Sequence, residues 1–198
     1  FKDMNDAINA SIEAQKKVCT MTLDQREQII SLIRKKTHEN AEILANMGVN
    51  ETGMGNVGDK ILKHHLTADK VPGTEDISTI AWSGDRGLTL VEMGPFGVIG
   101  AITPATNPSE TVICNCIGML AGGNTVVFNP HPNAKKTTIY TINMINEASI
   151  EAGGPDNIAV TVEAPTLDTS AIMMKHPSIH LLVATGGPGV VTAVLSSG

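Results

Sequence analysis

The sequence predicts an α/β fold in which helices cover both faces of a doubly wound parallel sheet, preceded by a helical N-terminal segment. Two observations carry this prediction. In the second half of the chain, four short apolar segments alternate with stretches of helical periodicity, each pair about as long as one βα unit. The apolar segments are continuous instead of alternating with polar residues, as expected when both faces of a sheet are covered. Right-handed crossovers then arrange such strands in an open parallel sheet.

The composition limits the size of the fold and the kinds of partner. A chain of 198 residues has room for one sizeable α/β domain, or for one domain and part of a second. A formal net charge of −6 and only 3% aromatic residues argue against nucleic acid as a partner. No apolar run reaches the roughly 18 residues that cross a bilayer, so we expect no membrane partner. The three cysteines have no repeated spacing, which favours a reducing, cytoplasmic location.

The first third of the chain is expected to be helical. A first helix breaks near Cys19, and Thr22 with Gln25 three residues later has the pattern of a capping box at the start of a second helix. That helix continues, with apolar and charged faces at a period of about 3.6 residues, until glycines cluster within 53–58. A shorter helix is expected over 60–70.

Residues 71–85 lose this periodicity and contain a Pro-Gly pair, so we interpret them as a connecting segment. Residues 88–91 are rich in branched side chains and predict a strand. These changes predict two parts of the chain. A helical part with its connecting segment covers 1–87, and a sheet-forming part covers 88–198.

The sheet-forming part has a regular order of elements. Its four apolar strands are expected at 98–102, 125–128, 158–162 and 180–184. Helices are expected at about 109–121, from beyond 132 to Gly153 and Gly154, at 167–175 and from Val190 onward. Ligands of such sheets bind beyond the carboxyl ends of the strands, where the loops 103–108, 129–132 and 185–189 lie.

The loop 103–108 is the first candidate for chemistry. Its two prolines stiffen it, Pro108 restricts Asn107 to extended geometry, and Ser109 can cap the helix that follows. Asn107 could direct an amide N–H at a developing oxyanion, a contact worth about 3–4 kcal/mol in an active site. On spacing alone, an ordinary capped turn with an exposed amide is the favoured explanation of the same residues.

Two further loops have features of a cofactor site. The glycine-rich turn 186–189 follows a strand and opens a helix, so its bare backbone could approach a pyrophosphate. It lacks the G-x-G-x-x-G pattern, and glycine-rich turns of this kind are common. His131, between Pro130 and Pro132, could hydrogen-bond a cofactor ribose or phosphate, or it could be an exposed loop histidine.

The cysteines and histidines do not suggest a reactive thiol or a metal site. Cys114 and Cys116 lie two residues apart on a predicted helix and therefore point to different faces. No neighbouring base is evident that would activate a thiol, so we interpret both as packing residues. The histidines have no spacing typical of metal ligands, and we predict no metal site.

Six segments are more specific together than separately, namely 92–100, 103–108, 123–132, 134–136, 152–155 and 185–187. In combination they resemble the CoA-acylating branch of the aldehyde dehydrogenase superfamily, most closely the propionaldehyde and acetaldehyde dehydrogenases of bacterial microcompartments. The resemblance extends over essentially the whole chain. It implies a Rossmann-like cofactor domain with its helical N-terminal part beside it.

The resemblance also implies an activity, the reaction of an aldehyde with CoA and NAD⁺ to acyl-CoA and NADH. In that family a cysteine thiolate attacks the aldehyde, hydride leaves to nicotinamide, and CoA takes the acyl group from the resulting thioester. NAD and coenzyme A are therefore the expected cofactors, and a small aldehyde is the expected substrate. Asn107 matches the family's asparagine that helps to hold the oxyanion. Thr103, Pro104 and Thr106 match the loop that flanks the nicotinamide and the substrate.

The remaining carried-over residues belong to the adenosine half of the cofactor site. His131 and Pro132 occupy the turn that carries a lysine-containing ribose motif in hydrolytic relatives. Gly186 and Gly187 match the helix start beneath the pyrophosphate. Val190 matches the position against the adenine.

One departure from the family pattern concerns the nucleophile. The family's cysteine lies downstream in a separate catalytic domain, and none of the three cysteines of this chain occupies the matching position. We therefore expect the cofactor-binding, N-terminal portion of a longer enzyme, inactive by itself. At full length we expect a homo-oligomer, a dimer or tetramer, in the cytoplasm, with a microcompartment shell as a further candidate partner. The alternative is a non-catalytic nucleotide-binding or scaffold module.

Overall fold

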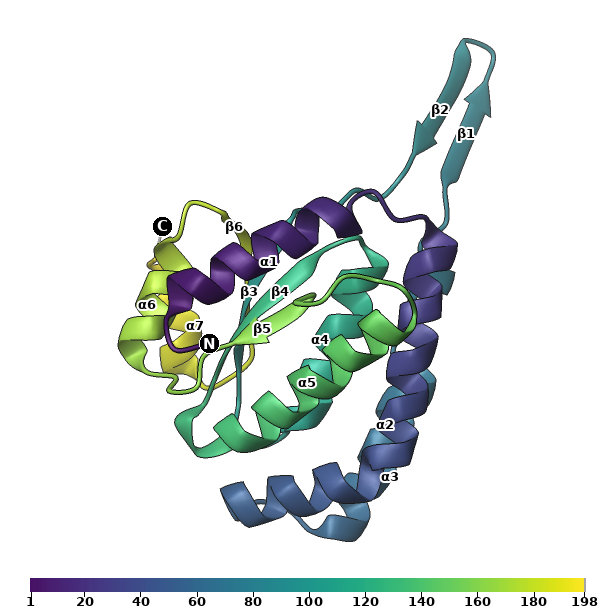
Figure 1. Ribbon diagram of the computed structural model, residues 1–198. Helices are drawn as coiled ribbons and strands as arrows, with labels where there is room; N and C mark the ends of the chain where they lie inside the picture. Colours follow the sequence, from purple (N-terminus) through teal and green to yellow (C-terminus); the bar gives the residue numbers. More distant parts are fainter. Residues whose placement is uncertain (198) are drawn as a thin grey trace.

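A four-stranded parallel sheet forms the centre of the computed structural model, which describes residues 1–197 (Figure 1). Its strands are β3 (Val98–Thr103), β4 (Thr125–Pro130), β5 (Ala159–Thr161) and β6 (Ile179–Ala184), in the order β5-β4-β3-β6. The strands that follow β3 are thus added on one side until β5, and β6 then pairs with the other edge of β3. The predicted α/β fold with a parallel sheet is confirmed. The order reverses between β3 and β6, which makes this pair the switch point of the sheet.

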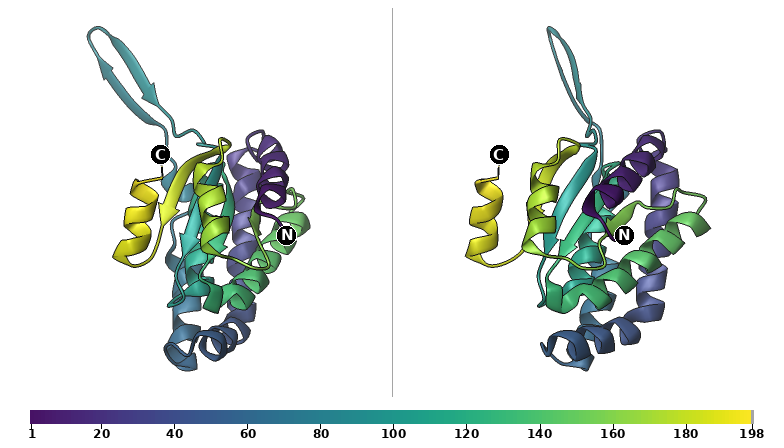
Figure 2. Two further views of the ribbon diagram at one scale, coloured as in Figure 1. Left: turned by 90° about the vertical axis from the view of Figure 1, so that its left-hand side faces the viewer. Right: turned by 60° about the vertical axis from the view of Figure 1, so that its left-hand side comes forward.

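Helices cover both faces of the sheet (Figure 2). On one face α4 (Pro108–Ala121) and α5 (Lys135–Glu151) pack on β3 and β4, where Val126 and Phe128 are fully buried. On the other face α1 (Met4–Val18) and α6 (Leu167–Lys175) enclose Val127. Successive residues of β4 therefore enter two separate cores, because side chains alternate across a strand. This explains why the strand has no polar face. α7 (Pro188–Leu195) follows β6 at the end of the described chain.

The helical N-terminal segment forms as predicted, with its breaks at capped ends. α2 (Leu23–Thr52) begins at a capping box, in which Thr22 Oγ1 accepts from the Gln25 N–H at 3.2 Å and Gln25 Oε1 accepts from the Thr22 N–H at 2.9 Å. It ends at Gly53, whose φ of 68° is left-handed. α3 (Val57–Lys70) then turns back along α2 and reaches the start of α4.

The expected connecting segment contains more structure than its sequence suggests. A 3₁₀ turn (Thr74–Asp76) precedes an antiparallel hairpin of β1 (Ile80–Gly84) and β2 (Gly87–Val91), which projects from the body of the molecule (Figure 1). The predicted strand at 88–91 is therefore present, but it pairs locally and lies outside the main sheet. All residues of both strands are exposed. The division of the chain at 87/88 stays a prediction, and it falls at the first residue of β2.

Candidate functional site

A cavity of about 500 Å³ lies at the carboxyl edge of the sheet, beside the switch point. Residues from the ends of β3 and β4 and from the turn after β6 line it together. The parallel register explains this meeting, because Thr103 is paired with Pro130, and Ile102 with Ala184. Three loops that are far apart in the chain thus end at one level of the sheet, as the sequence predicted.

Seven of the nine predicted site residues line this cavity, namely Thr103, Pro104, His131, Pro132, Gly186, Gly187 and Val190. Thr103 is 2% exposed, and its hydroxyl is buried without a hydrogen-bond partner among the described residues. A buried hydroxyl without a partner is costly. The end of β3 therefore carries a buried hydroxyl that no described residue satisfies.

Of the helix N-termini near this edge, one is available and another is occupied. α7 begins at Gly187, and within residues 1–197 no side chain caps it. At the start of α5, by contrast, the Glu51 carboxylate accepts hydrogen bonds of 2.7 Å from the N–H groups of Lys136 and Thr137. An uncapped helix N-terminus attracts anions through its N–H groups and its dipole. The start of α7 is thus the better position for a phosphate.

His131 is exposed at the rim, in the turn after β4. Its backbone N–H donates to the Thr103 carbonyl at 3.0 Å, which ties the ends of the two strands together. Its Nδ1 accepts from the Asn133 N–H at 3.1 Å. The ring is therefore held by one nitrogen, and Nε2 carries the proton and can donate to a ligand.

One wall of the cavity was not predicted from the sequence. Leu167, Ser170 and Met174 contribute from α6, and Met54 contributes from the loop between α2 and α3. Leu167 is 89% exposed although it is a large apolar residue. With Val190 and the prolines, these side chains give the cavity a mainly apolar lining, which suits a flat ring. No motif marks these residues, because a single apolar residue at a helix start has no distinctive pattern.

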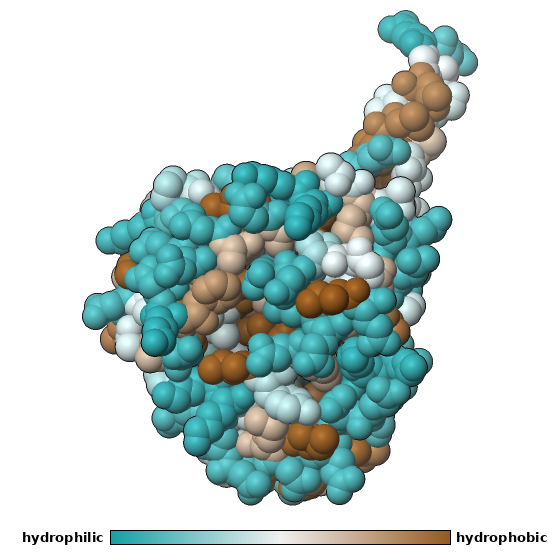
Figure 3. Space-filling model, in the orientation of Figure 1, coloured by the Kyte–Doolittle hydropathy of each residue, from teal (hydrophilic) through white to brown (hydrophobic). Residues whose placement is uncertain are grey.

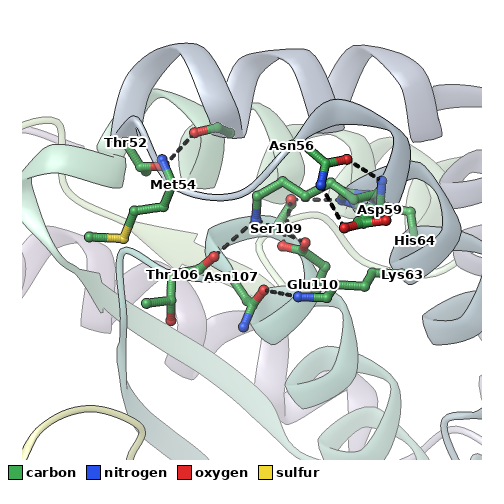
Figure 4. Close-up of polar contacts among 12 residues, drawn as sticks. Thr52, Met54, Asn56, Asp59, Lys63, His64, Thr106, Asn107, Ser109 and Glu110 are labelled. Atoms are coloured by element: carbon green, nitrogen blue, oxygen red, sulfur yellow. Dashed lines mark hydrogen bonds and ion pairs between the residues drawn. The ribbon is translucent and has the colours of Figure 1, made fainter.

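Thr106 and Asn107 are the two predicted site residues that do not line the cavity. They lie at the start of α4 beside α3 (Figure 4), where Asn107 is the N-cap residue. The Thr106 carbonyl accepts from Lys60 Nζ at 2.9 Å, and Asn107 Oδ1 accepts from Lys63 Nζ at 3.4 Å. The structure therefore separates an oxyanion candidate from the cofactor cavity, although both belong to the loop after β3.

The expectation that Ser109 caps α4 is wrong. The helix already begins at Pro108, so Ser109 lies inside its first turn and its side chain is directed to α3. Its Oγ is 2.8 Å from His64 Nε2 and 3.2 Å from Glu110 Oε2. Proline at the first helical position pre-sets the helical φ, so the N-cap is Asn107, two residues before the serine.

A buried polar network underlies this helix start. Lys60, His64, Ser109 and Glu110 are all less than 7% exposed, and Lys60 Nζ lies 3.3 Å from Glu110 Oε1. Burial lowers the pKa of His64 below its ordinary value. The imidazole is therefore neutral. Its Nδ1 donates to the Lys60 carbonyl at 2.7 Å, and its Nε2 accepts from Ser109. Sequence reasoning missed this network because α3 and α4 are about 45 residues apart in the chain.

The cysteines lie away from the cavity in the part of the chain that the structure describes. Burial raises the pKa of the Cys114 thiol, and it raises that of the fully buried Cys116 still further. Cys19 is exposed at the end of α1. Thiols with a raised pKa are poor nucleophiles.

Residues 1–197 contain neither a metal-ligand cluster nor a helix suited to a membrane. No three His, Cys, Asp or Glu side chains gather closely enough to hold a metal ion. No helix in that range is both long and apolar enough to cross a membrane.

These features define the class of the molecule. It is an open, doubly wound α/β protein with a cavity at the switch point of the sheet and a helix N-terminus at one wall. The chain belongs to the aldehyde dehydrogenase family, whose sequence model, described as "Aldehyde dehydrogenase family", matches residues 1–198.

Individual relatives place the chain near the CoA-acylating members. It is 50% identical over 191 residues to the acetaldehyde dehydrogenase (acetylating) of Bilophila wadsworthia, covering 96% of this chain and 39% of the relative. It is 44% identical over 198 residues to the propanal dehydrogenase (CoA-propanoylating) of Salmonella typhimurium, covering 100% of this chain and 43% of the relative.

A solved structure is closer still. The propionaldehyde dehydrogenase from the fucose utilisation microcompartment of Clostridium phytofermentans is 73% identical, with a TM-score of 0.98 over 100% of this chain and 46% of that one. The chain thus spans less than half the length of each of these relatives.

Proposed function

We propose that this chain is the cofactor-binding portion of an NAD-dependent, CoA-acylating aldehyde dehydrogenase. The reaction converts an aldehyde, CoA and NAD⁺ into acyl-CoA and NADH. The observation that carries the proposal is the cavity at the switch point, where seven residues matched by family resemblance surround one space of about 500 Å³. A space of this size and lining suits a mononucleotide portion of a cofactor.

The lining residues suggest how a dinucleotide lies in the cavity. The start of α7 at Gly187 would hold the pyrophosphate with its N–H groups, because no acidic side chain occupies that position among the described residues. The apolar side chains of Val190 and Leu167 would flank the adenine, and His131 Nε2 would reach the ribose. Thr103 and Pro104, on the end of β3, would flank the nicotinamide, which accepts hydride when NAD is bound.

Asn107 is proposed to stabilise the oxyanion that forms when a thiol adds to the aldehyde. Its Oδ1 is engaged by Lys63, so the amide nitrogen is the group left to donate. The nucleophile is proposed to be a cysteine outside this chain, since burial raises the pKa of Cys114 and Cys116 and Cys19 lies on a helix end away from the cavity.

The projecting hairpin supports the proposal of a homo-oligomer. Ile80, Trp82, Leu88 and Leu90 are 48–64% exposed, and Figure 3 shows apolar side chains along the shaft of the hairpin. An isolated two-stranded hairpin is at best marginally stable in water, so a partner surface is expected to cover it. We propose a second copy of the protein as that partner. By analogy with the microcompartment relative, we further propose that the enzyme works inside a bacterial microcompartment in the cytoplasm, with the shell as a partner.

Absorbance of NADH tests the proposal directly. The full-length protein that carries this chain is given NAD⁺ with acetaldehyde or propanal, with and without CoA, and NADP⁺ replaces NAD⁺ in a parallel series. We expect turnover that requires both CoA and aldehyde. Turnover without CoA would indicate a hydrolytic dehydrogenase instead. Binding of NAD⁺ with no turnover on either aldehyde would favour the non-catalytic nucleotide-binding module.

A further inference from the structure

We propose that Lys60 is a positioning residue for Asn107, holding the peptide bond between Thr106 and Asn107 from inside the protein. The inference rests on the proposed oxyanion role of Asn107. Lys60 is on α3, in a part of the chain remote from the cofactor loops, and its ammonium reaches the carbonyl of Thr106 in the loop after β3.

The ammonium of Lys60 is buried and has two polar partners. The side chain is part of a residue that is only 3% exposed, and Nζ donates to the Thr106 carbonyl at 2.9 Å and lies 3.3 Å from Glu110 Oε1. Burying a charge is costly unless it is paired and hydrogen-bonded, and a buried pair adds little net stability over apolar residues. Because the buried pair of Lys60 and Glu110 adds little net stability, its presence suggests a functional use of the contact.

The position of the contact identifies that use. The carbonyl of Thr106 lies in one planar peptide group with the Cα atom of Asn107, so holding the oxygen also fixes the point from which the Asn107 side chain starts. Asn107 has φ −138° and ψ 69°, outside the helical region, and its side chain makes no capping bond within the described chain. The residue thus depends on contacts from outside its own helix.

The surrounding network holds Lys60 itself in place. Its backbone carbonyl accepts from His64 Nδ1 at 2.7 Å, and His64 Nε2 lies 2.8 Å from Ser109 Oγ, one residue before Glu110. α3 and α4 are therefore joined by two contacts, one between Lys60 and Glu110 and one between His64 and Ser109. The ammonium has little freedom to move relative to the Thr106 carbonyl.

Lys63, one turn further along α3, contacts the Asn107 side chain from the solvent side. Its Nζ lies 3.4 Å from Asn107 Oδ1, and the amide nitrogen of Asn107 points away from it (Figure 4). Lys63 is exposed, so this contact is weak and screened. The two lysines therefore differ in what they contact. Lys60 holds the backbone carbonyl of Thr106, whereas Lys63 makes only a weak contact with the side-chain amide of Asn107.

The test uses the full-length enzyme with Lys60→Met combined with Glu110→Gln. Changing Lys60 alone leaves a carboxylate buried without its cation and endangers folding, whereas the pair removes both charges together. Lys70→Met, an exposed lysine on the same helix, is the matched control. We expect kcat to fall at least about tenfold in the paired variant, since small displacements of catalytic groups have effects of this size. KM for NAD⁺ is expected to change less than twofold, because the cavity is untouched.

Two readouts separate positioning from general damage. In an Asn107→Ala background, the paired change is expected to lower kcat by less than a further factor of two, because the group being positioned is gone. Hydrogen exchange over residues 103–108 is expected to accelerate in the paired variant and not in Lys70→Met. An unchanged kcat in the paired variant, or the same loss in the Asn107→Ala background, would overturn the proposal.

The exchange experiment also separates this inference from the proposed function. If the wild-type enzyme has no CoA-dependent turnover but exchange over 103–108 is faster in the paired variant, the proposed reaction is rejected. The role of Lys60 in holding this loop then still stands. Normal wild-type turnover with unchanged exchange and unchanged kcat in the paired variant would keep the reaction and reject the role of Lys60.

Discussion

The carboxylate of Glu51, near the end of α2, caps the first turn of α5 by accepting from both the backbone N–H and the hydroxyl of Thr137 at 2.7 Å. A third bond of the same length comes from the Lys136 N–H. A carboxylate at this position neutralises the positive end of the helix dipole. Glu51 thus joins α2 to α5, which covers one face of the sheet, and it excludes a phosphate from the start of α5.

Replacing Glu51 by alanine is expected to destabilise the protein without affecting cofactor binding. Loss of a helix cap costs about 0.5–2 kcal/mol, and a urea titration will show the change as a lower midpoint. Glu51→Gln keeps an acceptor oxygen and should lose less. A gain of NAD⁺ affinity in Glu51→Ala would show that the start of α5, once freed of this carboxylate, faces the cofactor phosphates.

Gly187→Asp is expected to keep or raise the stability of the protein and to lower its affinity for NAD⁺. Gly187 is the N-cap of α7 with ordinary φ and ψ of −71° and 169°, and a Cβ there would meet nothing within 4 Å. Aspartate is a better cap than glycine by a few tenths of a kcal/mol, so the midpoint of unfolding should hold or rise. Its charge would lie where the pyrophosphate is proposed, and Kd for NAD⁺ should rise at least about tenfold, or 1.4 kcal/mol.

Gly187→Ala is the control for that experiment, since it adds a side chain without charge. Its Kd for NAD⁺, measured by the same fluorescence titration, should stay within about threefold of wild type, or roughly 0.6 kcal/mol. Equal affinities of the alanine and aspartate variants for NAD⁺ would show that the pyrophosphate does not bind at the start of α7.

Acidification is expected to weaken the α3–α4 contact through His64. Because burial lowers the pKa of His64 in the folded protein, the unfolded chain binds a proton at this residue at a higher pH than the folded chain does. Protonation therefore favours unfolding. The contribution of neutral His64 is fully present above its unfolded pKa of about 6.5 and is lost as the pH falls below it.

Urea titrations between about pH 7.5 and about pH 5 will measure this effect, since one proton changes the free energy of unfolding by at most about 1.36 kcal/mol per pH unit. The decline should be steeper in wild type than in His64→Gln, whose amide cannot titrate. His176→Gln, on a partly exposed histidine at the end of α6, should keep the wild-type slope. Identical slopes in wild type and His64→Gln would contradict the assignment.

Charged substitution in the hairpin is expected to dissociate the proposed oligomer. Leu90 is 60% exposed on β2 and is paired with Ala81, the neighbour of the single tryptophan, Trp82. In the full-length protein, Leu90→Asp should reduce the mass measured by light scattering and shift the emission of Trp82 to longer wavelength. Leu62→Asp, at a 68% exposed position on α3, should change neither. A protomer-sized mass for the wild type would already disprove assembly through the hairpin.

Several features of the fold could be predicted because they depend on neighbouring residues. The capping box of Thr22 and Gln25 and the continuous apolar runs of the strands are local patterns, and both formed as expected. The loops after β3, β4 and β6 could be assigned to one edge because parallel strands place all their carboxyl ends on the same side.

The start of α4 shows the limit of the same reasoning. The sequence around Ser109 is compatible with a cap, but Pro108 begins the helix and the serine turns to His64 instead. The projecting hairpin is a second example, since nothing local distinguishes a strand of the main sheet from one that pairs only with its neighbour.

By itself, the sequence determined the strand and helix order from β3 onward, the sheet type and the edge where the three loops meet, because periodicity and turn residues act over a few positions. Only the tertiary structure decided which groups meet across long separations. Lys60 and the Thr106 carbonyl are 46 residues apart, and Glu51 and Thr137 are 86 apart. Such contacts depend on how whole helices pack, and a buried charge finds its partner only when that packing removes water from both.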